Sequence, residues 1–123
     1  MIDHVSIAVK DLDVSTKFYE ELLSVIGFSK LIEKKGTVGF GKKYPEFWLN
    51  ERKNLNDSQI SDGFHVCLRA ASVELVNNFY NKAIELSARS GGEPGLREEY
   101  SATYYAAFII DNDGNKIEVV TFT

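Results

Sequence analysis

The sequence has few of the features that mark a secreted, membrane or nucleic-acid-binding protein. It has a single cysteine, Cys67, so no disulfide can form within the chain, and we expect a reducing, cytoplasmic location. No apolar run approaches the roughly 20 residues of a membrane-spanning helix. The opening MIDHVSIAVKDLD lacks a basic region, apolar block and cleavage site, so we expect no secretion signal. The net charge is only −4 and no basic cluster accompanies aromatic residues, which argues against a nucleic-acid partner.

The remaining composition is that of one globular domain. A chain of 123 residues, 44% hydrophobic and 26% charged, can bury a core without disulfides or structural metals. Composition therefore predicts a single soluble domain and says nothing about its chemistry.

A duplication is visible along the chain. The segment HVSIAVKDLDVSTKFYEEL, starting at His4, aligns without a gap with HVCLRAASVELVNNFYNKA, starting at His65. The offset of 61 residues (65 − 4) matches both histidines of the protein and the Phe-Tyr pairs at 18–19 and 79–80. Two strand-turn-helix units could share such a pattern by chance. Four identities at one offset favour two copies of one module.

Each module is predicted to combine strands with one helix. Alternating β-branched residues predict strands at 4–9 and 64–70, each followed by a segment with helical spacing. The first helix has Asp11 or Asp13 as its N-cap and stops at Gly27, and the second runs from about 72 to 88.

Two hairpins and a connector complete the predicted organisation. One hairpin turns near 42–45, and the other at DNDG, where Asp113–Gly114 is a strong turn signal. The segment SGGEPGLREEY, at 90–100, is predicted to be a loop. The fold class is α+β, with helices covering one face of antiparallel-rich sheets. Module one spans about 1–52, a polar connector about 53–62, and module two about 63–123.

Strand parity decides which side chains face the helices. In the first strand Val5, Ile7 and Val9 form an aliphatic face that should pack beneath the helix, which leaves His4 on the other face. The same parity separates Val66 from His65 in module two. Four strands each direct one distinctive residue away from the helices: His4, Trp48, His65 and Glu118.

Two imidazoles and a carboxylate on one face are the ingredients of a divalent-metal site with positions open for water and substrate. The alternative is that each histidine is a hydrogen-bonded structural residue and that Glu118 faces solvent. The repeat gives His4 and His65 equivalent positions, and this puts metal binding on an equal footing with the alternative.

Further candidates share this face or border it. Arg69 could bind a substrate carboxylate or phosphate, or form a salt bridge at the sheet edge. Tyr104 and Tyr105 alternate, so one should line the site as a donor or a wall. Cys67 has the same parity as His65, and a small filler residue is favoured over a catalytic thiol. Arg97 and Tyr100 lie in the predicted loop, where a lid is expected.

The segments HVSIAVKDLDVSTKFYEELL and YYAAFIIDNDGNKIEVV resemble the vicinal oxygen chelate superfamily, also called the glyoxalase/bleomycin-resistance/dioxygenase group. The resemblance covers essentially the whole chain. It implies two tandem βαβββ modules that form a curled sheet around a cleft, with metal ligands on the first and last strands of each module. The implied ligands are His4, His65 and Glu118, with Glu118 also the catalytic carboxylate.

The resemblance places Trp48 at the position of a fourth ligand. Tryptophan cannot ligate a metal, so glyoxalase I activity itself is not expected. The remaining His-His-Glu set is similar to that of fosfomycin-modifying transferases and extradiol dioxygenases.

The implied function is a divalent-metal-dependent enzyme acting on a small oxygen-chelating substrate, of lyase, isomerase, transferase or dioxygenase type. The metal could be Zn, Ni, Mn or Fe. Trp48, Arg69, Tyr104 and Tyr105 are the candidate substrate-binding residues. A homodimer is expected, with His4 from one chain and His65 with Glu118 from the other. The alternatives are a metal-free, bleomycin-resistance-like binding protein and a remnant whose vacant site is kept for packing.

Overall fold

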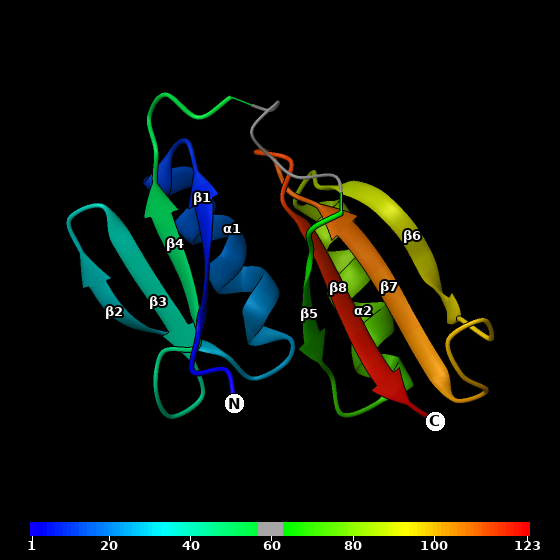
Figure 1. Cartoon of the computed structure of the whole chain (residues 1–123). Helices are drawn as coiled ribbons and strands as arrows, with labels where there is room; N and C mark the ends of the chain where they lie inside the picture. Colours follow the sequence, from blue (N-terminus) through cyan, green and yellow to red (C-terminus); the bar gives the residue numbers. More distant parts are fainter. Residues whose placement is uncertain (57–62) are drawn as a thin grey trace. The chain divides into compact units, whose positions relative to one another are not determined.

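The structure of the protein is a computed structural model that describes residues 1–56 and 63–123. The chain divides into two compact units, residues 1–60 and 61–123. Part of the predicted connector, residues 57–62, lies outside the described residues. Unit 1 contains β1 (Val5–Val9), α1 (Leu12–Ser24), β2 (Ser29–Lys34), β3 (Thr37–Gly41) and β4 (Phe47–Glu51) (Figure 1). Unit 2 contains β5 (Val66–Arg69), α2 (Val73–Glu85), β6 (Arg89–Leu96), β7 (Tyr104–Ile110) and β8 (Lys116–Phe122).

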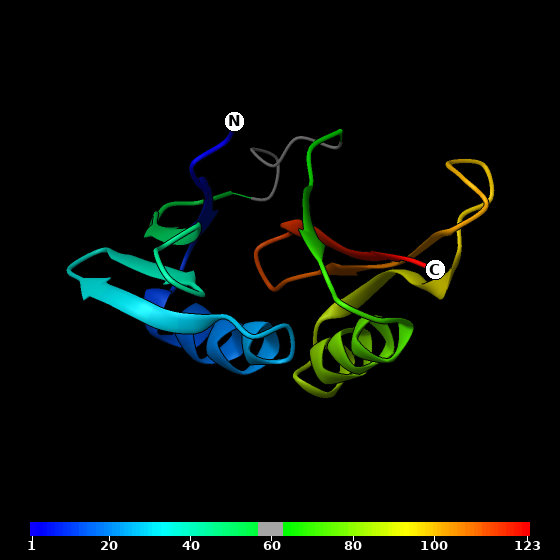
Figure 2. The ribbon, with the colours of Figure 1, turned by 90° about the horizontal axis from the view of Figure 1, so that it is seen from below.

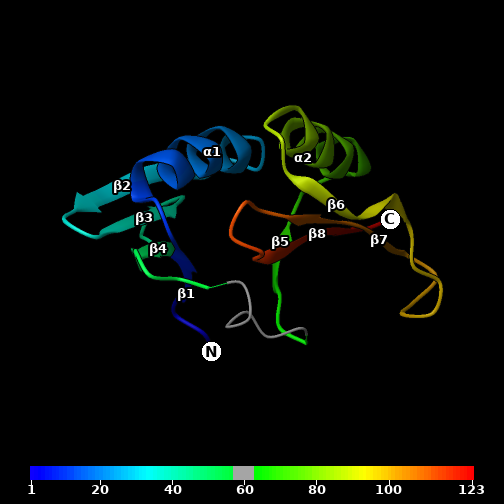
Figure 3. The same cartoon turned by 90° about the horizontal axis from the view of Figure 1, so that it is seen from above.

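Each unit is a βαβββ module, which confirms the predicted fold class. The strand orders are β1-β4-β3-β2 and β5-β8-β7-β6. In both sheets the first strand pairs in parallel with the last, and the other pairs are antiparallel. Each helix lies along one face of its own sheet, α1 in Figure 2 and α2 in Figure 3. Neither helix is long and apolar enough to cross a membrane.

The sequence repeat corresponds to equivalent elements. Both ends of α2 lie 61 residues after those of α1. The N-caps Asp11 and Ser72 are also 61 apart, and each side chain accepts a hydrogen bond from the backbone N–H three residues later. The aligned aromatic pairs differ in burial, however, because Tyr19 is fully buried in α1 whereas Phe79 is fully buried in α2. The repeat therefore preserves the elements and exchanges which aromatic ring fills the core.

Each helix is followed by a left-handed residue, three positions after the end of α1 and two after the end of α2. Gly27, the predicted stop, has a φ of 86°, and the N–H groups of Gly27 and Phe28 donate back to the last turn of α1. In unit 2 the corresponding left-handed residue is Ser87, with a φ of 74°. Ala88 N–H then donates to Ala83 O at 2.9 Å. The second helix therefore ends at Glu85 rather than near residue 88.

The loop predicted at 90–100 is wrong for its first part, because β6 occupies residues 89–96. This strand pairs with β7 through two register shifts. A Cβ at Gly91 would lie 3.1 Å from the Cβ of Phe108, so a side chain there would crowd the neighbouring strand. The glycines of this segment allow close approach of Phe108, whereas in the sequence they suggested a loop.

Strand alternation follows the predicted parity. Ile7, Val9 and Leu49 are buried, whereas His4 is exposed and Trp48 is half-buried. In unit 2 Val66 is buried and His65 is exposed. The aliphatic faces thus form the cores beneath the helices, and the candidate site residues of these strands lie on the opposite faces.

Candidate functional site

Glu118, at the middle of β8, is the centre of a polar cluster on the sheet of unit 2. Its side chain is only 3% exposed. Its Oε1 lies 3.0 Å from Nε2 of His65. Its Oε2 accepts a hydrogen bond from the hydroxyl of Tyr104. A carboxylate removed from water requires such partners, so the pair of contacts explains how the sheet accommodates it.

The strand order brings these partners together. β8 lies between β5 and β7, and Glu118 is paired with Cys67 on one side and with Phe108 on the other. His65 directly precedes β5, so it approaches Glu118 from the β5 side. Tyr104, at the start of β7, approaches from the opposite side.

Of the two candidate tyrosines, Tyr104 shares the face of Glu118. Tyr105 has the opposite parity, and its hydroxyl donates to Oδ1 of Asn77 on α2 at 2.7 Å. Tyr105 is therefore part of the packing between β7 and α2, on the face away from Glu118.

Cys67 is paired with Glu118 across the β5–β8 ladder, and part of its side chain is exposed. Desolvation first, and then the negative charge and hydrogen-bond acceptance of Glu118, raise the pKa of the Cys67 thiol to about 12. Desolvation and the hydrogen bond to Glu118 likewise raise the pKa of Tyr104 above its ordinary value. Both groups are protonated at neutral pH, so they can act as hydrogen-bond donors to Glu118.

Aromatic rings and cations surround the cluster. The His65 ring meets Phe108 edge to face at 5.7 Å between centroids, and the Lys116 ammonium lies 4.9 Å from the same ring centroid. Arg69 lies over the ring of Phe122 at 4.7 Å, a cation–π contact. The guanidinium of Arg97 is held by the carbonyls of Gly95 and Glu93 at 3.0 and 2.8 Å.

In unit 1, His4 precedes β1 and its side chain is 51% exposed. Its Nδ1 lies 2.7 Å from Oδ1 of Asp3, so a ligand to this imidazole would bind through Nε2. The ring meets Trp48 edge to face, with 6.4 Å between centroids.

Trp48 occupies in unit 1 the place that Glu118 occupies in unit 2. Ser6 pairs with Trp48 in the parallel β1–β4 ladder, and Cys67 pairs with Glu118 in the β5–β8 ladder. Ser6 and Cys67 are related by the 61-residue offset. The indole lies against Gly39, where an added Cβ would come within 3.0 Å of the ring. Unit 1 therefore has an aromatic side chain at the position where unit 2 has a carboxylate.

These donors fit a divalent metal in part. His65 and Glu118 offer one nitrogen and one oxygen on the same face, a donor set suited to Mn, Fe, Ni or Zn. Among residues 1–56 and 63–123, no three His, Cys, Asp or Glu side chains are grouped to hold a metal ion. This pair by itself therefore falls short of the three protein ligands that an open catalytic site uses.

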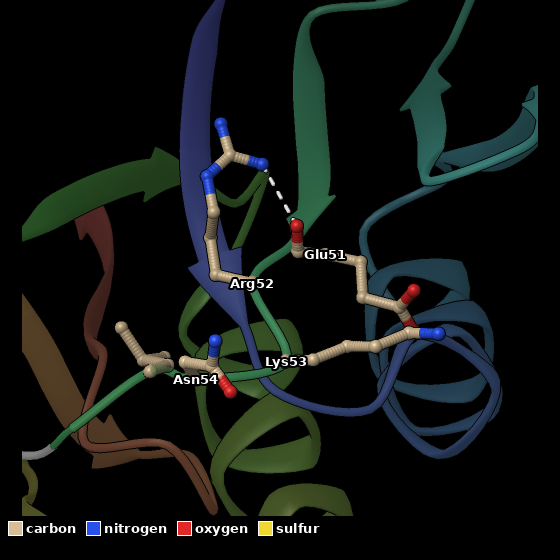
Figure 4. Close-up of a pocket in the computed structure, with 5 residues that line it drawn as sticks. Glu51, Arg52, Lys53 and Asn54 are labelled. Carbon is tan, nitrogen blue, oxygen red and sulfur yellow. Dashed lines mark hydrogen bonds between the residues drawn. The ribbon is translucent and has the colours of Figure 1, made fainter.

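A separate open pocket of about 530 Å³ lies at the end of β4, lined by Glu51, Arg52, Lys53, Asn54 and Leu55 (Figure 4). The Arg52 side chain donates to the carbonyl of Glu51 at 2.8 Å. This pocket contains none of the candidate site residues, so its size does not identify it as the functional site.

Residues 1–119 match the model of the Glyoxalase/Bleomycin resistance protein/Dioxygenase superfamily, so the chain belongs to this superfamily. No curated protein sequence matches the chain. A glyoxalase/bleomycin resistance protein from Albidiferax ferrireducens is 28% identical, with 96% of each chain covered and a TM-score of 0.85.

Two more distant structures share the fold. One is a fosfomycin resistance protein of Listeria monocytogenes, an E126Q mutant in complex with Mn(II) and 1S,2S-dihydroxypropylphosphonic acid. It is 15% identical, with 100% of this chain and 90% of that chain covered and a TM-score of 0.74. The other is the bleomycin resistance determinant encoded on transposon Tn5, which is 18% identical, with coverages of 95% and 93% and a TM-score of 0.69.

Proposed function

We propose that this protein is a divalent-metal-dependent enzyme and that His65 and Glu118 form the unit 2 half of its metal site. The observation that carries the proposal is the buried Glu118 carboxylate 3.0 Å from the His65 imidazole. The two donors lie on one sheet face and belong to adjacent, hydrogen-bonded strands or their ends. The Mn(II) complex of the Listeria fosfomycin resistance protein supports this proposal, because it has the same fold with a divalent ion bound.

The third ligand in this proposal is His4, binding through Nε2. Asp3 at 2.7 Å from Nδ1 would orient the imidazole, as carboxylates often do for metal-bound histidines. We propose a homodimer in which His4 of one chain joins His65 and Glu118 of the other. Light scattering tests the dimer, and a monomer that still binds metal would contradict the shared site.

When bound, the metal would supply a Lewis acid that stabilises an anion forming on a substrate oxygen. The protein's own residues have separate tasks. His65 Nε2 and Glu118 Oε1 would hold the metal, and Tyr104 donates a hydrogen bond to Oε2 of Glu118. Phe108 and Trp48 provide apolar surface that excludes water. Arg69 offers a cation to an acidic group of the substrate. The reaction remains of lyase, isomerase, transferase or dioxygenase type.

Metal binding to untagged protein tests the proposal. After dialysis against a chelator, the protein is titrated with Mn²⁺, Ni²⁺ and Zn²⁺ by calorimetry, and the bound metal is counted by elemental analysis. We expect one site per chain, lost in His65→Ala and in Glu118→Gln. Glu74→Gln is the matched control, because Glu74 is an exposed glutamate on α2. Absence of stoichiometric binding of all three ions would overturn the proposal.

A metal-free binding protein is the second candidate, and one observation favours it. Trp48 replaces a carboxylate at the position equivalent to Glu118, so unit 1 presents an aromatic ring there. Because Trp48 is the only tryptophan of the chain, its fluorescence reports a ligand that stacks on it. Saturable quenching by bleomycin in metal-free protein, with no metal site by calorimetry, would favour this function.

A further inference from the structure

We propose that Tyr104 is a positioning residue that holds Oε2 of Glu118 and thereby directs Oε1 toward His65. This inference rests on the proposed function, in which Glu118 is a metal ligand. It adds that Tyr104, which would not itself hold the metal, engages Oε2 of Glu118 and leaves Oε1 as the oxygen beside His65.

The contact depends on the length of tyrosine and on a small residue beside it. Tyr104 is paired with Phe122, four residues from Glu118, which is roughly 13 Å along an extended strand. Ala106 lies between Tyr104 and Phe108 on the same face and is fully buried. Because its side chain is a single methyl group, the phenol can extend across it to reach the carboxylate.

Two further rings fix the orientation of the phenol. The ring of Tyr100 meets it at 5.1 Å and an interplanar angle of 74°. The ring of Phe122 meets it at 5.4 Å and 90°. Edge-to-face contacts of this kind restrain the ring before any ligand arrives, which is the requirement for a preorganised site.

A simpler role is that Tyr104 only satisfies a buried carboxylate and so stabilises the fold. The two roles differ in what they change. If Tyr104 only stabilises the fold, loss of its hydroxyl should lower the midpoint of unfolding and leave the affinity of the folded protein for metal unchanged. If Tyr104 is a positioning residue, loss of its hydroxyl should also weaken metal binding in fully folded protein, because the carboxylate loses its fixed direction.

Tyr105→Phe is a matched control for Tyr104→Phe. It removes the same hydroxyl from the adjacent residue of the same strand, and that hydroxyl also donates to a side-chain oxygen, Oδ1 of Asn77. The control therefore reproduces the chemical change and the loss of one hydrogen bond on the face away from Glu118.

The test is the affinity of folded, untagged protein for Mn²⁺ and Zn²⁺, measured by calorimetry after circular dichroism has confirmed folding. We expect Tyr104→Phe to bind about 10- to 100-fold more weakly than wild type, the usual effect of removing a partner of a metal ligand. Tyr105→Phe should stay within about twofold of wild type. Equal affinity of Tyr104→Phe and wild type would overturn the inference.

Imidazole ¹⁵N chemical shifts at one fixed pH separate this inference from the proposed function. The chain has only two histidines, so the His65 signals can be assigned with His4→Gln. If wild type binds no metal, the proposed function fails, and these shifts still report the His65–Glu118 contact. A change in Tyr104→Phe with none in Tyr105→Phe supports the positioning role. Unchanged His65 shifts in both variants overturn it.

Discussion

The pairing of Cys67 with Glu118 predicts that the Cys67 thiol is alkylated unusually slowly. A pKa of about 12, against the ordinary 9.0, means that at pH 8 about one thiol in 10⁴ is ionised rather than about one in 11. This lowers the thiolate population about 900-fold. The remaining thiolate is more nucleophilic, with a Brønsted slope of about 0.4–0.5, and a difference of three in pKa returns a factor of about 16–30. The net expectation is alkylation roughly 30- to 60-fold slower than that of an ordinary cysteine.

Iodoacetamide labelling at pH 8, followed by mass spectrometry, measures this rate. Because Cys67 is the only cysteine, no other thiol contributes, and the same chain unfolded in urea gives the reference rate. Glu118→Gln should speed alkylation, because it removes the adjacent negative charge. Desolvation is the larger cause of the raised pKa, so alkylation should still be slower than in the unfolded chain. Glu74→Gln should have no effect. Labelling of the folded wild type as fast as the unfolded chain would refute this account of the cluster.

The other predictions concern stability. The pKa of Cys67 is raised on folding, so the stability that its protonated thiol contributes is fully present below pH 9 and is lost as the pH rises from about 9 toward 12. The urea midpoint of unfolding should fall over this range, and less steeply in Cys67→Ala. Ser87→Gly should raise the free energy of unfolding by about 1 kcal/mol, since only glycine adopts its left-handed conformation without a penalty. Gly39→Ala should lower this free energy by about 1–3 kcal/mol and shift the Trp48 emission, because the added methyl group meets the indole at 3.0 Å.

Each stability prediction has its own control. A flat urea midpoint between pH 9 and 12 would contradict the Cys67 prediction. Gly27→Ala, at the equivalent helix end of unit 1, should be destabilising by about the amount that Ser87→Gly gains. Gly63→Ala should be neutral, because within residues 1–56 and 63–123 no heavy atom beyond its chain neighbours lies within 4 Å of the added methyl group. An equal loss there would argue against a steric cause at Gly39.

Periodicity and the repeat predicted the elements that carry a clear pattern. The helix N-cap, predicted at Asp11 or Asp13 and found at Asp11, follows from local rules that depend on a few neighbouring residues, as do the stop at Gly27 and the turn at Asp113–Gly114. Neither β2 nor β6 was predicted from the sequence. Glycine has two opposite uses, flexible loops and close strand contacts, and only the position of Phe108 on β7 decides between them.

For the candidate site, parity placed His65 and Glu118 on one face but did not predict the role of Tyr104. Parity concerns residues that lie directly across a ladder, whereas Tyr104 reaches Glu118 past Ala106 from a position paired with Phe122. The choice between Tyr104 and Tyr105 needed the strand register, which no spacing in the sequence specifies. The contribution of His4 stays a prediction, because it belongs to the other unit of the chain.

The register equivalence of Trp48 and Glu118 has a practical consequence for the study of duplicated domains. The only tryptophan of the chain belongs to unit 1, and the only cysteine, paired with Glu118, belongs to unit 2. Each half therefore carries a natural probe of its own, one fluorescent and one chemical. Monitoring denaturation by indole emission reports on unit 1, and monitoring it by thiol trapping reports on unit 2, both in the unaltered chain. Coincident curves would mean that the halves melt as one cooperative unit, and separate curves would mean that each has kept the autonomy of an ancestral half-domain.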